Sequence, residues 1–184
     1  QRQYLFTKAF GPLKLSGYIL SPSGSATGSF LIGQGTSFLD GGNYYIDPNN
    51  PSYINDSGTT ISKIWRYYNS SSYTECVYDT NSPNPNGYET IDPTRYSNNG
   101  VLTAVPGTGA NKQWSIQRVF YFPNSIRKIS VVYYGNATYS TRDIAIANIP
   151  IEPFTEAPIT MDSAIYIGAL ILRNDASFTD SSTY

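Results

Sequence analysis

Apolar side chains occur in short runs, and clusters of Gly, Pro, Asn, Asp and Ser separate these runs. No window has a sustained apolar pattern at i, i+3, i+4 and i+7, whereas short runs bounded by turn residues are typical of antiparallel strands. We therefore expect an all-β antiparallel sandwich or jelly-roll-like domain with at most one short helix. The expected strands are 3–10, 13–20, 28–33, 36–39, 61–69, 73–79, 114–122, 126–134 and 164–173.

Two of the expected strands have apolar or aromatic side chains on both faces. In "VVYY" (131–134), Val131 and Tyr133 alternate with Val132 and Tyr134, and "AIYIGALILR" (164–173) repeats this pattern. A strand at the surface of a sandwich normally alternates apolar and polar residues, so both faces of these strands must be covered. We expect the cover to come from the core on one side and from a short helix or a neighbouring subunit on the other.

The clearest hairpin joins 114–122 to 126–134, and a second hairpin joins 61–69 to 73–79. Residues Gly135-Asn136 are expected to form the turn that ends the first hairpin's return strand. The best helix candidate is 141–149, where Ser140 or Thr141 can cap the N-terminus, Asp143 suits the first turn and Pro150 ends the helix.

Segments 40–60 and 80–100 are rich in turn residues and are expected to be elaborated loops, which often carry binding residues. The 184 residues suit a single domain, with a loop-rich half at 1–113 and a more regular half at 114–184.

Composition excludes several classes of function. The net charge is −1 and no basic stripe occurs, so we expect no nucleic-acid partner. No apolar stretch approaches the roughly 20 residues of a membrane helix, so no membrane insertion is expected. The chain has no histidine, which excludes Ser-His-Asp and Cys-His catalysis, and Cys76 is expected to be a small apolar side chain.

The remaining catalytic or metal-binding candidates are carboxylates in loops. A glycosidase needs two carboxylates at a defined separation, but Asp residues at turns normally bond their own backbone. "DGGNYYIDPNN" (40–50) lacks the spacing of a calcium loop. We therefore expect no enzymatic activity, no cofactor and no metal site. The carboxylates considered were Asp40, Asp47, Asp56, Glu75, Asp79, Glu89 and Asp92.

Tyrosine is the unusual feature of the composition, with 17 residues, and only 14% of the chain is charged. Tyrosine gives a large contact area and a hydrogen-bonding hydroxyl at low entropic cost, which suits a recognition surface that binds glycan. The alternative is that tyrosines fill strands, the core or a subunit interface. The candidate ligand-binding residues are Tyr44, Tyr45, Tyr53, Arg66, Tyr68, Tyr73, Tyr88 and Tyr96.

Residues 114–173 resemble the distal region of bacteriophage tail fibres. The resemblance rests on "WSIQRV", "YYGN", "AIANIP" and "YIGALILR" in that order, and covers about a third of the chain. It implies a homotrimeric virion component that is made in the bacterial cytoplasm and binds a host surface glycan or, as the second choice, a protein. Two alternatives are a carbohydrate-binding module or spike domain of a polysaccharide-degrading enzyme, and a structural fibre or capsid-decoration module.

Overall fold

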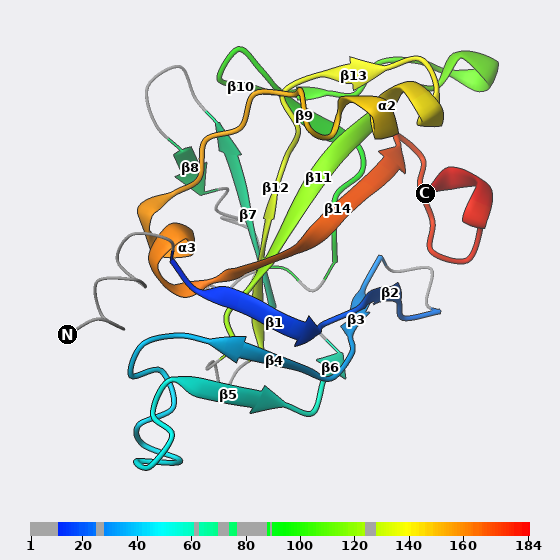
Figure 1. Ribbon diagram of the computed structural model, residues 1–184. Coiled ribbons are helices and arrows are strands. Elements are labelled where there is room, and N and C mark those ends of the chain that lie inside the picture. Colours follow the sequence, from blue (N-terminus) through cyan, green and yellow to red (C-terminus); the bar gives the residue numbers. More distant parts are fainter. Residues whose placement is uncertain are drawn as a thin grey trace.

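The computed structural model describes residues 11–24, 28–60, 63–69, 74–76, 88, 90–123 and 128–184, with the backbone alone for 59–60 and 74–76. The expected strand 3–10 lies outside these residues. The described chain is mostly β and contains both antiparallel and mixed sheets (Figure 1). The all-β prediction therefore holds at this level.

The largest sheet has six strands, in the order β14, β11, β12, β7, β8, with β13 pairing to β11 beyond the end of β12. All its pairings are antiparallel except β7 with β12, which is parallel, so the prediction of a purely antiparallel fold is wrong. The bounds are β7 (Lys63–Asn69), β8 (Thr74–Cys76), β11 (Trp114–Tyr121), β12 (Ile129–Tyr133), β13 (Thr138–Tyr139) and β14 (Ile165–Arg173).

Both hairpins predicted within this sheet are confirmed. β11 pairs with β12, Val119 facing Val132, and β7 pairs with β8, Tyr67 facing Cys76.

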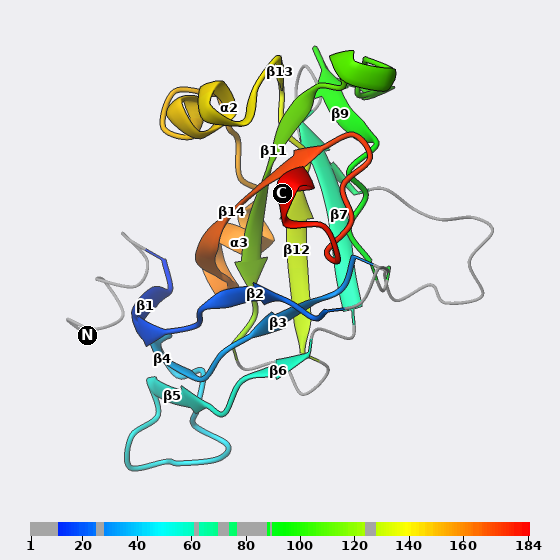
Figure 2. The same cartoon turned by 90° about the vertical axis from the view of Figure 1, so that its right-hand side faces the viewer.

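Two three-stranded antiparallel sheets lie at one end of the molecule (Figures 1 and 2). One contains β1 (Leu13–Gly17), β4 (Gly35–Phe38) and β5 (Tyr53–Asp56), and the other contains β2 (Leu20–Pro22), β3 (Phe30–Ile32) and β6 (Thr59–Thr60). β5 and β6 fall within 40–60, which was expected to be loop throughout. In β5, burial alternates as in an ordinary strand despite the turn-rich composition around it: Ile54 and Asp56 are buried, while Tyr53 and Asn55 are exposed.

A further hairpin, β9 (Arg95–Asn98) and β10 (Val101–Ala104), lies at the opposite end, and β9 falls within segment 80–100, which was expected to be loop. Its two-residue connection is Asn99-Gly100, whose φ angles are +48° and +86°. Two consecutive positive φ angles define the tight turn that matches the twist of a hairpin, and Asn-Gly is its commonest sequence.

The described residues contain two α-helices, so the expectation of at most one is wrong. α2 (Arg142–Asn148) is the predicted helix, and its N-cap Thr141 accepts a hydrogen bond from Ile144 N at 3.3 Å. α3 (Pro158–Ser163) begins with proline at its first turn, a position where the missing N–H costs nothing. Two 3₁₀ turns, Gly109–Asn111 and Ser181–Thr183, complete the helical segments.

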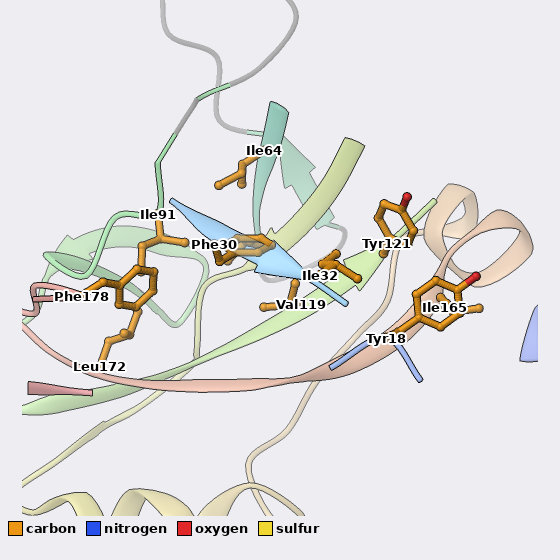
Figure 3. Close-up of a cluster of buried hydrophobic side chains, with 11 residues drawn as sticks. Tyr18, Phe30, Ile32, Ile64, Ile91, Val119, Tyr121, Ile165, Leu172 and Phe178 are labelled. Atoms are coloured by element: carbon orange, nitrogen blue, oxygen red, sulfur yellow. The ribbon is translucent and has the colours of Figure 1, made fainter. Parts of the chain in front are cut away.

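Both faces of the β11–β12 hairpin are buried by the chain itself. Figure 3 shows the cluster on one face, where Phe30 and Ile32 of β3 lie against Val119 and Tyr121 of β11. The cluster also contains Tyr18, Ile64, Ile91, Val132, Ile165, Leu172 and Phe178.

On the opposite face, Phe120 and Tyr133 pack with Phe154 and with Ala157, just before α3. α2 covers the far end, where Ala145 packs on Trp114 and Ile116. The face of "VVYY" that carries Val131 and Tyr133 is therefore covered mainly by residues 154–164 and not by the predicted helix. No neighbouring subunit is needed to bury it.

An ion pair between a buried carboxylate and a partly exposed lysine joins β5 to the main sheet. Asp56 ends β5, and its carboxylate accepts hydrogen bonds from Tyr121 Oη at 2.6 Å and from Lys128 Nζ at 2.9 Å. Burial alone would raise the pKa of Asp56, but these bonds and the one from Gly58 N outweigh it and lower the pKa. The loop that precedes β5 is thus carried on a strand that is anchored in the core.

Candidate ligand-binding sites

The segment between β4 and β5 projects from the end of the molecule that carries β1, β4 and β5 (Figures 1 and 2). Its base is closed by backbone hydrogen bonds from Leu39 N to Ser52 O at 2.9 Å and from Asn43 N to Pro51 O at 2.7 Å. We refer to residues 40–53 as the projecting loop.

Hydrogen bonds within the projecting loop give it a defined shape. Ile46 N and Asp47 N both donate to Asn43 O, at 3.0 and 2.9 Å, which forms a turn around the aromatic residues. The Asp47 carboxylate accepts from Asn50 Nδ2 and from the backbone N–H groups of Asn49 and Asn50. The side-chain bond from Asn50 and these backbone bonds lower the pKa of Asp47, so the carboxylate that orders the loop is ionised at neutral pH.

The side chains at the tip of the projecting loop are large, apolar and exposed. Tyr45 is 98% exposed, Ile46 82% and Tyr44 66%. Tyr53 at the base is half exposed and packs edge-on against Phe38, with ring centroids 5.6 Å apart. A soluble protein seldom places adjacent large apolar side chains in water, and such a patch is typical of an interaction site. Three predicted site residues, Tyr44, Tyr45 and Tyr53, therefore lie together on this loop.

The Arg66 side chain, in contrast, makes its contacts within the protein and is not available to a ligand. Its guanidinium lies 3.8 Å from the ring centroid of Tyr88, and its Nη2 donates to Thr90 O at 2.7 Å. Only 12% of the side chain is exposed, and Asp92 lies 4.0 Å away. Arg66 and Tyr88 therefore hold the chain beside β7.

Tyr68 on β7 and Tyr96 on β9 are half-buried strand residues. β9 lies at the end of the molecule opposite the projecting loop, so the predicted residues do not converge on one surface. Tyr73 lies outside the described residues, as do Asp79 and Glu89 and the side chains of Glu75 and Cys76.

The Asp residues considered as catalytic candidates have structural partners. Asp47, Asp56 and Asp92 each accept a hydrogen bond from the backbone N–H two residues further on, as turn residues are expected to do. Asp92 also accepts from Tyr134 Oη at 2.9 Å; burial and the Asp92 charge raise the pKa of Tyr134. In the described part of the chain, no three His, Cys, Asp or Glu residues are placed to hold a metal ion.

A pocket of about 420 Å³ opens beside the β9–β10 turn, at a place where no site was expected. Three segments form it: the Asn99-Gly100 turn, the Asn136-Ala137 turn after β12, and residues 152–155. Asn69, the last residue of β7, also lines it. We refer to this feature as the asparagine pocket.

A network of fixed hydrogen bonds forms the wall of the asparagine pocket. Asn136 Nδ2 donates to Asn69 Oδ1 at 3.2 Å and to Pro153 O at 2.5 Å, and Asn69 Nδ2 donates to Thr155 O at 2.7 Å. The position before Asn136 requires a glycine, because a Cβ on residue Gly135 would clash with the backbone oxygen of Ile116. The glycine and asparagine of "YYGN" therefore do more than end a strand.

Sequence reasoning missed the asparagine pocket because its residues lie far apart in the chain. The signal that existed was the pair of Asn-Gly and Gly-Asn turns, 99–100 and 135–136, but nothing in the sequence shows that they meet. A backbone hydrogen bond from Ser97 N to Gly135 O at 2.8 Å brings them together.

No helix in the described residues has the length and apolar character needed to cross a membrane. Comparison with known proteins found no matching family model, no matching curated protein and no matching solved structure.

Proposed function

We propose that the chain is the receptor-binding domain at the distal end of a bacteriophage tail fibre. It attaches the virion to a receptor on the host cell surface, and we favour a glycan over a protein as that receptor. The observation that carries the proposal is the projecting loop, which presents Tyr44, Tyr45 and Ile46 to solvent on a hydrogen-bonded frame. Exposed aromatic side chains on an ordered loop bind with little loss of conformational entropy. The resemblance of residues 114–173 to tail fibres supports the same function.

The proposal includes a homotrimer, and exposed apolar side chains support it. Exposed apolar side chains occur on α2, α3, β14 and the β1 end, and these elements line one side of the molecule (Figure 2). Large exposed apolar side chains are typical of contacts between subunits. The exposed apolar residues of these elements are Leu15 of β1, Ile19 just after it, Ile144 and Ile146 of α2, Ile159 and Met161 of α3, and Tyr166 of β14.

Light scattering tests the assembly. We expect the wild-type protein to have three times the mass of one chain at micromolar concentration, and Met161→Asp to have the mass of a single chain. Val101→Asp is the matched control, because Val101 is similarly exposed but lies on β10, away from that side. A monomeric wild-type protein would contradict the trimer.

The attachment role is tested with fluorescent protein incubated with a panel of bacterial strains. Binding to some strains and not to others is the expected result. Absence of binding to every strain would favour the alternative of a structural fibre or decoration module. Within the proposal the domain is not an enzyme, needs no cofactor or metal, and does not bind nucleic acid or insert into membranes.

The alternative is a carbohydrate-binding module or spike domain from a polysaccharide-degrading enzyme. It shares the binding role but adds cleavage of the polysaccharide. Incubation with bacterial surface polysaccharide and measurement of reducing ends separates the two. No increase is expected for the receptor-binding domain.

We also propose that the β2–β3–β6 sheet and the six-stranded sheet, which share the cluster of Figure 3, form the two layers of a sandwich.

A further inference from the structure

We infer that the asparagine pocket binds one neutral sugar ring of the host glycan. The inference rests on the proposed attachment function and assigns the chemistry of one part of the receptor. The pocket volume of about 420 Å³ falls in the range of small-ligand sites. Its place, beside β9 and away from the projecting loop, makes it a second point of contact.

The amide groups suit sugar hydroxyls, which need both donors and acceptors. Both Asn136 Nδ2 contacts are to protein oxygens, so the amide is held in one orientation, and its Oδ1 accepts no hydrogen bond from the described residues. Asn99 lies on the turn at the rim, is exposed, and has no hydrogen-bond partner among the described residues. Its side chain offers two donors and an acceptor to a ligand.

An apolar wall complements these amides. Phe154 lines the pocket and is held in place by Phe120, with ring centroids 5.8 Å apart, and by Tyr133 at 4.9 Å. Pro153 and Ala137 add further apolar surface. The C–H groups of a sugar ring can pack on such a wall while its hydroxyls face the amides.

Electrostatics favours a neutral ligand. Among the described residues, Glu152 is the one charged residue that lines the pocket, and its side chain is fully buried. Its Oε1 accepts from Arg118 Nη1 at 3.2 Å and from Asn136 N at 2.9 Å, and its Oε2 accepts from Tyr139 Oη at 2.8 Å. The carboxylate is therefore paired with Arg118 and hydrogen-bonded at both oxygens within the protein, which leaves no unpaired charge on the described lining of the pocket.

The test is saturation-transfer NMR with calorimetry, using glucose, galactose, mannose and N-acetylglucosamine as neutral probes and N-acetylneuraminic acid as the charged one. We expect at least one neutral sugar to bind with a dissociation constant of about 1 mM, the affinity of a weak single-site ligand. The acidic sugar is expected to bind more weakly than the best neutral one.

Three variants locate the binding. Asn99→Gly removes the amide but keeps the positive φ, and Ala137→Phe fills the pocket; each is expected to weaken sugar binding at least fivefold. Asn98→Ala is the matched control, because Asn98 is an exposed neighbour that does not line the pocket, and it should bind as the wild type does. Circular dichroism verifies that each variant is folded.

Sugar binding that survives both Asn99→Gly and Ala137→Phe would overturn the assignment, as would the absence of binding by every neutral probe. These failures are distinct from failure of the attachment proposal. A protein that binds bacterial cells but none of the sugars would keep its attachment role and lose the pocket assignment. A protein that binds no cells would reject the attachment role itself.

Discussion

Tyrosine has opposite roles in two regions of this molecule. Tyr45 on the projecting loop is 98% exposed, whereas Tyr133 on β12 is 1% exposed and contacts the rings of Tyr67, Phe120 and Phe154. The hydroxyl of Tyr133 bonds Thr160 Oγ1 at 2.6 Å and accepts from Ala157 N at 2.9 Å. Both tyrosines belong to Tyr-Tyr pairs, 44–45 and 133–134, so the residue type alone does not distinguish a surface from a core.

What distinguishes the two regions is whether other segments cover them. Strand β12 has β7 and β11 as neighbours, and residues 154–164 cover the face that carries Tyr133. The hydrogen bonds of the projecting loop run mainly within it, and it joins the rest of the molecule through β4 and through β5, which the Asp56 ion pair holds to the main sheet. A segment stabilised by its own hydrogen bonds can present apolar side chains to a partner without weakening the core.

The largest expected effect is on the buried side of this comparison. Tyr133→Ala removes a buried ring and two hydrogen bonds, so the free energy of unfolding should fall by about 3–5 kcal/mol, as for other large-to-small core substitutions. Urea unfolding followed by tryptophan fluorescence measures it. A loss of less than 1 kcal/mol would show that residues 154–164 do not pack on this ring as described.

An intermediate effect is expected where the loop-bearing sheet joins the core. Asp56→Asn keeps the size of the side chain but removes the charge that Lys128 pairs with, and should lower the free energy of unfolding by about 1.5–3 kcal/mol, the range for hydrogen bonds to charged groups. Lys128 is 31% exposed, which places the expected loss at the lower end. An unchanged free energy would mean that this ion pair does not fasten β5.

The same carboxylate predicts a pH dependence. The pKa of Asp56 is lower in the folded protein than in the unfolded chain, so its contribution to stability is present above the unfolded value of about 3.9. That contribution is lost as the pH falls through the lower, folded pKa. The difference in unfolding free energy between wild type and Asp56→Asn should therefore shrink as acid is added, and a difference that grows would contradict the ion pair.

The smallest stability effect is expected at the loop tip. Tyr45→Ala should change the free energy of unfolding by no more than about 0.5 kcal/mol, because the ring is almost fully exposed. Urea unfolding is again the measurement. A large loss would place Tyr45 in a packed environment and remove the distinction between the two regions.

The sequence predicted local features of the fold better than it predicted contacts between distant segments. The hairpins and helix α2 were predictable because short apolar runs bounded by turn residues, a capping Thr141 and the stop at Pro150 are local signals. The Asn-Gly signal of the β9–β10 turn was also local, but the surrounding turn-rich composition concealed it. The parallel pairing of β7 with β12 joins segments more than 60 residues apart, and no residue pattern specifies it.

The candidate sites were predictable to a similar extent. The loop tyrosines were identified because Asp, Asn, Gly and Pro surround them, and these residues indicate a surface loop. Arg66 and Tyr88 were assigned to a ligand because aromatic and cationic residues also suit binding, yet they contact each other. The asparagine pocket depends on the meeting of three distant segments, which only tertiary structure shows.

The most direct test of the attachment role compares wild type with the double variant Tyr44→Ala/Tyr45→Ala in binding to bacterial cells that the wild-type protein recognises. Val101→Ala is the matched control, because it also trims an exposed apolar side chain, on β10 at the other end of the molecule. Flow cytometry over a range of protein concentrations gives the apparent affinities. At least a tenfold loss for the double variant, with unchanged unfolding free energy and unchanged binding by Val101→Ala, is the predicted result. Wild-type binding by the folded double variant would contradict the assignment of recognition to the projecting loop.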